Sequence, residues 1–360
     1  MRLLYVEDQL DYANAISAEL SKKMSVIVYD GKGLDTNPHE RGDMPIEKQI
    51  ADGIRTLEHA DGQFDAVLLD TDLSNFKNGI SQSAFRSACS MIGLPVLRYS
   101  KKGLTQPSDR LKYLATIARE GSQAILVPDS ILHEGLADWV LNVALSFKNI
   151  REQIEKQAKD GRVVSPAALL AEMINIPNID IDLIGYSGAN FFFFGDLIES
   201  PIDNKLETKT RNYSTQFGYW LANYVLMFPG PILNRGAAAA HLGVTKNDLI
   251  KSAEALAVLQ EAAYTGPFAS QGDYFVRQLL DQLLASSDKS NYVELLQSKG
   301  IQLEDATVEN ASETFYYCIV NDVPILDSDA RGPFDWIPRG ADICRVRKDT
   351  YDKFGPWLNV

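Results

Sequence analysis

The sequence predicts a doubly wound α/β domain, built on a five-stranded parallel sheet, followed by a larger, mainly helical α+β domain. Two observations predict the first domain. Short apolar runs of strand length alternate along residues 1–150 with segments whose apolar residues recur at helical spacing, which is typical of parallel strands joined by crossover helices. One run, residues 66–69, is apolar throughout and ends abruptly in Asp70, as expected for a strand that is buried on both faces.

Each element of the first domain has its own signal. Residues 2–6 form an apolar run, and residues 12–20 carry apolar side chains at helical spacing before Lys22 and Lys23, which suit a helix C-terminus. Residues 31–44 are polar and contain glycine and proline, so we expect a loop there. The other expected strands are residues 25–29, 66–70, 94–99 and 124–127, and the other expected helices are residues 46–57, 81–92, 109–120 and 136–154.

A domain boundary is expected between residues 150 and 165. The long helix that begins at residue 136 runs into charged and polar residues. The chain then restarts at Ser165, a typical N-cap residue, with Pro166 at the first helical position. We therefore predict a first domain over residues 1–150, whose last helix leads into an output domain over residues 165–360.

The second domain shows no familiar family pattern, and its elements are predicted one by one. Residues 191–194 are four phenylalanines, best explained as a buried strand. Residues 236–249 have the pattern of a helix-turn-helix, with Thr245 as the N-cap of the second helix. The other expected elements are a helix over residues 215–228 that Pro229-Gly230-Pro231 ends, a helix over residues 274–284 and a hairpin over residues 315–325.

The segment from residue 327 to residue 347 is dense in arginine, aspartate, glycine and proline. Three arginines lie beside two aspartates in it, which is compatible with an anion site, an ion-pair network or a compact loop pinned by Trp336. These residues are Arg331, Arg339, Arg345, Asp335 and Asp342. The sequence favours the compact loop and leaves the other two interpretations open.

The composition restricts the class of protein. The 360 residues carry a formal net charge of −13, which disfavours nonspecific attraction to nucleic-acid phosphates or anionic lipid. No apolar run approaches the roughly 18 residues of a membrane span, and the N-terminus lacks a signal-peptide pattern. Cys89, Cys318 and Cys344 are far apart, which argues against a disulfide framework or a cysteine zinc site and favours a reducing, cytoplasmic location.

Acidic and hydroxyl side chains follow three of the predicted strands. Glu7 and Asp8 follow the first strand, Asp70 ends the third, and Ser100 follows the fourth in the run Pro-Val-Leu-Arg-Tyr-Ser. The carboxyl ends of parallel strands meet at one edge of a sheet, where open α/β sheets place their chemistry. In these motifs, residues 1–150 resemble the receiver domain of two-component response regulators, whose sheet is flavodoxin-like with the strand order 2-1-3-4-5.

The resemblance implies a phosphorylation site that uses Mg²⁺. Asp70 would be the phospho-acceptor. Glu7, Asp8 and Asp70 would hold the metal with help from the backbone carbonyl of Asp72, and Ser100 would hydrogen-bond the acyl phosphate. The partner would be a histidine kinase or another phosphodonor.

One departure from the receiver pattern concerns the fifth strand. Receivers carry a lysine at the end of that strand, where this sequence has Val127 before Pro128. Lys101 or Lys102 would have to take its place. A degenerate receiver, which binds partners without a phosphorylation cycle, therefore stays open.

The sequence thus predicts a signal-transduction protein whose receiver-like domain controls an output domain that binds protein. The alternative is an enzyme with a Rossmann-like N-terminal domain and a ligand cleft that the second domain closes. A further alternative is a DNA-binding regulator that acts through residues 236–260. The charge disfavours it, because Lys246 and Lys251 are the only lysines or arginines between residues 236 and 264, whereas DNA binding needs phosphate contacts.

Overall fold

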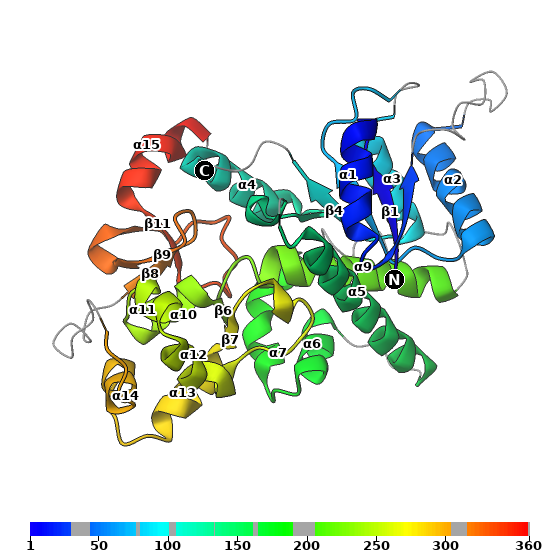
Figure 1. The fold of residues 1–360 in the computed structure, drawn as a ribbon. Helices are drawn as coiled ribbons and strands as arrows, with labels where there is room; N and C mark the ends of the chain where they lie inside the picture. Colours follow the sequence, from blue (N-terminus) through cyan, green and yellow to red (C-terminus); the bar gives the residue numbers. More distant parts are fainter. Residues whose placement is uncertain are drawn as a thin grey trace. The chain divides into compact units, whose positions relative to one another are not determined.

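The computed structural model describes residues 1–29, 44–76, 80–100, 106–132, 134–160, 165–189, 206–303 and 315–358. The strand expected at residues 191–194, nearly all of the loop expected at residues 31–44 and part of the expected boundary lie outside these ranges. The chain divides into two compact units (Figure 1). The first unit is Met1–Gly103, Ser122–Val163 and Phe193–Tyr219, and the second is Leu104–Gly121, Val164–Phe192 and Trp220–Val360.

A five-stranded sheet forms the centre of the first unit. Its strand order is β2-β1-β3-β4-β5, and every neighbouring pair is parallel, as the sequence predicted. This order, with helices between the strands, fits a flavodoxin-like fold. The strands are β1 (Arg2–Val6), β2 (Ser25–Tyr29), β3 (Ala66–Asp70), β4 (Val96–Tyr99) and β5 (Ile125–Leu126). The helices are α1 (Leu10–Leu20), α2 (Ile46–Asp61), α3 (Gln82–Ile92), η1 (Asp129–Ile131), α5 (Leu136–Lys159) and α9 (Leu206–Trp220), the last residue of which belongs to the second unit.

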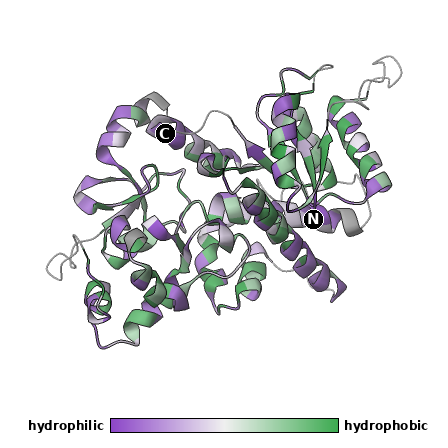
Figure 2. Ribbon diagram, in the orientation of Figure 1, coloured by the Kyte–Doolittle hydropathy of each residue, from purple (hydrophilic) through white to green (hydrophobic). Residues whose placement is uncertain are grey.

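The sheet is covered on both faces because its strands are apolar on both sides. Alternate residues of β1, β3 and β4 pack with α2 and α3 in one core, which includes Val67, Leu69 and Phe85. The helices α1 and α5 contact each other, and the buried side chains of α1 lie outside that core. Figure 2 shows the strands as hydrophobic and the outer helices as two-coloured. Burial on both faces leaves the strand ends as the place for polar chemistry.

Helix α9 packs against the end of the sheet at which β4 begins, opposite the carboxyl ends of the strands. Arg211, Thr215 and Tyr219 follow one another at intervals of four residues and so lie on one face of the helix. The Thr215 hydroxyl donates to the Gly93 carbonyl at 2.7 Å, and the Tyr219 hydroxyl accepts from the Val96 N–H at 2.7 Å. The sequence predicted that this helix begins at residue 215, whereas it begins at Leu206. The prediction relied on the spacing of hydrophobic residues, and the contacts of this helix with β4 are polar.

A buried ion pair fixes the same helix. Arg211 makes a two-point contact with Glu58 of α2 at 2.7 and 3.1 Å, and it also donates to the Phe64 carbonyl at 3.1 Å. The two side chains are only 11% and 10% exposed. Close packing continues at Gly93, which has φ of +63° and where a Cβ would lie 2.3 Å from the Asn212 side chain. The first unit therefore includes a helix more than 100 residues after β4.

The second unit is mainly helical and contains two small sheets. The hairpin expected at residues 315–325 is confirmed as β8 and β9. The strands of the second unit are β6 (Ile232–Asn234), β7 (Tyr274–Val276), β8 (Phe315–Cys318), β9 (Val323–Leu326), β10 (Ala330–Arg331) and β11 (Cys344–Arg347). Its α-helices are α4 (Pro107–Glu120), α6 (Pro166–Ile174), α7 (Ile179–Asp182), α10 (Arg235–Leu242), α11 (Lys246–Lys251), α12 (Ala253–Leu259), α13 (Arg277–Ala285), α14 (Tyr292–Ser298) and α15 (Lys348–Leu358). Shorter turns are η2 (Leu183–Ala189), the π-helix η3 (Leu221–Val225), η4 (Gln260–Ala262), η5 (Ala269–Gln271) and η7 (Asp327–Asp329).

Two predicted helices of the second unit differ from the structure. Residues 274–276 form β7 rather than the first turn of a helix, because they pair antiparallel with β6, whose residues lie 40 to 44 positions earlier in the chain. The helix expected to run to residue 228 changes to the π-helix η3 after Trp220. Among the described residues, no helix combines the length and the apolar character needed to cross a bilayer.

The helix pair expected at residues 236–249 is present as α10 and α11. Gly243 adopts φ of +69° at the turn, and Thr245 caps α11 through a hydrogen bond from the Asp248 N–H. The small residues of α10 are buried, which explains its alanines by packing. DNA binding by this pair stays a prediction.

Candidate metal centre

Three carboxylates converge at the carboxyl ends of β1 and β3. One ligand oxygen from each of Glu7, Asp8 and Asp70 lies within 4.8 Å of the other two. The register pairs Val6 with Leu69, so the residues that follow these strands are neighbours at the sheet edge. No other group of three potential metal-binding side chains comes this close in the part of the chain that the structure describes. The structure therefore brings together the three side chains that the sequence selected.

Backbone N–H groups orient each of these carboxylates. The Gln9 N–H donates to Glu7 at 2.9 Å, the Asn75 N–H donates to Asp8 at 2.6 Å, and the Asp72 N–H donates to Asp70 at 3.2 Å. The loop after β3 thus supplies two of the three donors. The other oxygen of Asp8 is buried and accepts no hydrogen bond from the described residues. The acids are fixed in place by the chain that surrounds them.

A tyrosine pair completes the surroundings of Glu7. The Tyr99 hydroxyl donates a hydrogen bond to Glu7, and the Tyr5 and Tyr99 hydroxyl oxygens are 3.0 Å apart. The ring of Tyr12 stacks on that of Tyr99 with 6.3 Å between centroids. Burial, together with Tyr5 and Glu7, raises the pKa of the Tyr99 hydroxyl well above its usual range, so it remains a proton donor.

Sequence reasoning missed these tyrosines, although a signal existed. A tyrosine in an otherwise apolar buried strand needs a partner for its hydroxyl group. Tyr5 and Tyr99 are both fully buried, and Tyr99 pairs in register with Asp70. A polar partner at this edge of the sheet was therefore to be expected.

The arrangement concentrates negative charge in a buried place. Asp70 is fully buried and Glu7 is 2% exposed, while Asp8 is half-buried. Two like unit charges at such separations repel by about 3–4 kcal/mol at an effective dielectric constant of about 20. A bound cation or a proton relieves this repulsion. Carboxylate oxygens are the ligands that Mg²⁺ prefers, so the donor set fits a hard divalent cation.

The structure gives these positions to the other residues of the predicted phosphorylation site. Ser100 is half-buried and follows Tyr99, the register partner of Asp70. Asp72 contributes its N–H to Asp70, and its carbonyl as a metal ligand stays a prediction. Val127 is buried, and its N–H donates to the Arg98 carbonyl at 2.8 Å. Lys101 and Lys102 lie outside the described residues.

Comparison with known proteins assigns no family to this chain. No protein-family model, curated protein or solved structure matches it. The geometry of the acidic cluster, on a flavodoxin-like sheet, therefore carries the functional argument.

Proposed function

We propose that the first unit is a receiver-like signalling module in which Glu7, Asp8 and Asp70 hold a divalent cation such as Mg²⁺. The observation that supports this most is the convergence of three oriented carboxylates at the ends of β1 and β3. The order of the strands and the polar residue that follows β4 agree with it. In this function the second unit is the output, and its partner is a protein.

Asp70 is the proposed phospho-acceptor. One of its carboxylate oxygens would attack the phosphorus of a phosphodonor such as a phosphohistidine kinase, and the bond from phosphorus to the leaving group would break with the electron pair on that group. The bound cation would neutralise charge on the phosphoryl oxygens. The Tyr99 hydroxyl keeps Glu7 oriented, and the Ser100 hydroxyl would donate to the product. Such a change in charge and hydrogen bonding is what a receiver passes to its output.

Intact-protein mass spectrometry tests the phosphoryl transfer. After incubation with acetyl phosphate and Mg²⁺, we expect a mass increase of one phosphoryl group that is stable in acid and labile in base. EDTA and the Asp70→Asn variant should abolish it. Asp288→Asn is the matched control, because Asp288 is an exposed aspartate of the second unit that pairs with Lys289, and it should keep the adduct.

Two features favour a second candidate, a cation-dependent module without phosphoryl transfer. Val127, at the position of the receiver lysine, is buried and apolar, and Asp70 has no exposed surface. A phosphodonor reaches Asp70 only if its surroundings open. Under this candidate Mg²⁺ stabilises the protein against urea and acetyl phosphate leaves no adduct. A protein that shows no response to Mg²⁺ would overturn both candidates.

A further inference from the structure

A cleft of about 690 Å³ lies in the second unit and shares no residue with the acidic cluster of the first unit. Its volume is in the range of about 300–1,000 Å³ that is usual for small-molecule sites. Helix α13 forms one wall of the cleft. The residues of this wall form two adjacent rows on the helix, and within each row they are four positions apart. The wall consists of Arg277, Gln278, Asp281, Gln282 and Ala285. The loop before β11 supplies Arg339, Gly340 and Asp342, and this is the segment whose arginines and aspartates the sequence singled out.

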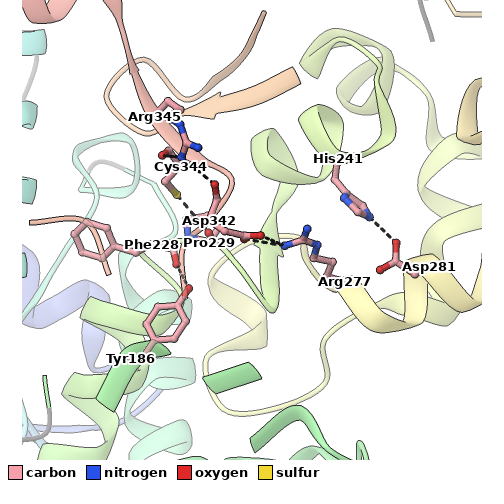
Figure 3. Close-up of polar contacts among 9 residues, drawn as sticks. All are labelled: Tyr186, Phe228, Pro229, His241, Arg277, Asp281, Asp342, Cys344 and Arg345. Carbon is pink, nitrogen blue, oxygen red and sulfur yellow. Dashed lines mark hydrogen bonds and ion pairs between the residues drawn. The ribbon is translucent and has the colours of Figure 1, made fainter. Parts of the chain in front are cut away.

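The backbone is closely packed around Gly340, which lines the cleft. A Cβ on Gly340 would lie 2.3 Å from the Tyr186 ring, and a Cβ on Gly230 would lie 1.9 Å from the Gly340 carbonyl oxygen. The Tyr186 hydroxyl donates to the Phe228 carbonyl at 2.6 Å (Figure 3). Side chains other than glycine do not fit at these two positions without movement. The backbone of the cleft at Gly340 is therefore fixed by its neighbours.

Charged groups of both signs are held in place on its walls. Arg277 donates to both oxygens of Asp342 at 2.8 and 2.9 Å. Asp281 accepts at one oxygen from His241 and from the Tyr292 hydroxyl, each at 2.9 Å. Figure 3 shows Arg277 and Asp281 on α13, directed at Asp342 and His241 respectively. The hydrogen bond with His241 holds the pKa of the Asp281 carboxyl below its usual value, so this side chain stays ionised.

Several groups on the walls keep unused hydrogen-bonding capacity. Arg339 is exposed and forms no ion pair with any residue in the described ranges. Among the described residues, no hydrogen bond involves the side-chain amides of Gln278 and Gln282 or the second carboxylate oxygen of Asp281. Each glutamine offers a donor and an acceptor, which is the complement of a peptide bond.

The composition of the walls disfavours several ligand classes. No aromatic side chain is among the described residues that line the cleft, so a nucleobase has no stacking platform. Three aspartates face two arginines, which disfavours a polyphosphate. Among the described residues that line the cleft, only Pro231 and Ala285 have apolar side chains, which disfavours a lipid.

We propose that this cleft binds a short peptide with a free ammonium group and a free carboxylate. The carboxylate pairs with Arg339, the ammonium group pairs with the second oxygen of Asp281, and the peptide bonds pair with Gln278 and Gln282. The cleft thus recognises a peptide that carries both charges. A free-ended peptide fits the opposed charges better than any ligand that carries charge of one sign.

Calorimetric titration of the full chain tests this with trialanine as the probe. Acetylated trialanine lacks the cation, and trialanine amide lacks the carboxylate. We expect trialanine to bind at least tenfold more tightly than either blocked peptide. In Arg339→Ala, trialanine and its amide should bind equally, and in Asp281→Asn, trialanine and its acetylated form should bind equally.

Matched variants separate recognition from folding. Arg331→Ala removes an exposed arginine of the same region, whose guanidinium lies over Tyr351 instead of lining the cleft, and it should bind trialanine like the wild type. Circular dichroism of each variant checks that it folds. Equal binding of free and blocked peptides, no heat with millimolar trialanine, or tighter binding of inorganic phosphate than of trialanine would each overturn the proposal.

Discussion

The two units each hold an arginine–carboxylate pair, at different depths. In the first unit, Glu7 and Asp70 have almost no exposed surface, and the Arg211–Glu58 pair is about one-tenth exposed. Around the cleft of the second unit, the Arg277 and Asp342 side chains are 34% and 56% exposed. The chemistry of the two arginine–carboxylate pairs is the same, yet the solvent around them differs.

This difference separates a buried ion pair that holds the fold, Arg211–Glu58, from an exposed ion pair that lines a cleft, Arg277–Asp342. A buried charge that loses its partner keeps its desolvation cost, whereas an exposed one is rehydrated. We therefore expect the loss of the buried Arg211–Glu58 pair to act on stability and substitutions around the cleft to act mainly on binding. The predictions that follow test this separation.

The largest effect is expected from breaking the buried pair. Arg211→Leu leaves Glu58 buried without its counterion, which should lower the free energy of unfolding by about 3–5 kcal/mol. Urea unfolding followed by circular dichroism measures it. The double variant Arg211→Leu with Glu58→Leu removes both charges and should recover part of the loss. A single variant as stable as the wild type would contradict the structural role of the pair.

Removal of the divalent cation should have the next largest effect. At an Mg²⁺ concentration of about 100 times its dissociation constant, binding stabilises the folded state by about 2.7 kcal/mol. Asp70→Asn removes one ligand and one charge, so it should be more stable than the wild type in EDTA and should gain little from Mg²⁺. Thermal unfolding with and without Mg²⁺ measures both. A variant that keeps the full Mg²⁺ response would place the cation elsewhere.

Removal of the hydroxyl that orients Glu7 should have an intermediate effect. Tyr99→Phe leaves a buried carboxylate oxygen without its donor, which costs about 2 kcal/mol. Urea unfolding in EDTA measures this cost without the contribution of metal binding. Tyr316→Phe is the matched control, because Tyr316 is a half-buried tyrosine whose hydroxyl forms no described hydrogen bond, and it should change stability by less than about 0.5 kcal/mol.

The exposed pair of the cleft should contribute little to stability. Arg277→Leu leaves Asp342 half-solvated, so the loss should be about 0–1 kcal/mol. Urea unfolding of this variant beside Arg211→Leu compares the exposed ion pair with the buried one directly. A loss of more than about 2 kcal/mol would mean that the cleft pair belongs to the fold and not to ligand binding.

The smallest effect is a pH dependence at Asp281. The hydrogen bond with His241 lowers the pKa of this carboxyl in the folded state. Its stabilising contribution is therefore complete above the ordinary aspartate pKa of about 4 and is lost as pH falls through the lower folded value. Because the side chain is 56% exposed, we expect about 0.5 kcal/mol between wild type and Asp281→Asn at pH 6, shrinking below pH 4. A difference that grows on acidification would contradict the sign.

Local pattern predicted the sheet and the acidic cluster because both depend on short segments. The apolar run before Asp70 and the acids after β1 define strand ends, and the parallel order brings those ends together. The hydrogen bond between Tyr99 and Glu7 was not predictable in that way, because it joins residues 92 apart across the sheet. The convergence of the three carboxylates follows from the order of the parallel strands. The choice of Tyr99 as the donor to Glu7 depends on how side chains pack across the sheet.

Pairing over long distances explains the remaining differences. Residues 274–276 have apolar spacing that suits a helix, yet they pair with β6 and become a strand. The polar stripe of α9 carries no hydrophobic signal, although it fixes the base of β4. The cleft joins α13 to a loop more than 50 residues later, and no single segment contains its pattern.

The inclusion of α9 in the first unit has a consequence for synthesis. All five strands leave the ribosome before the helix that closes their base, and at about 5–20 residues per second the interval lasts several seconds. During that time Glu58 has no counterion and the Val96 N–H has no acceptor from Tyr219. The nascent sheet therefore lacks these two polar contacts at its base until α9 has been synthesised.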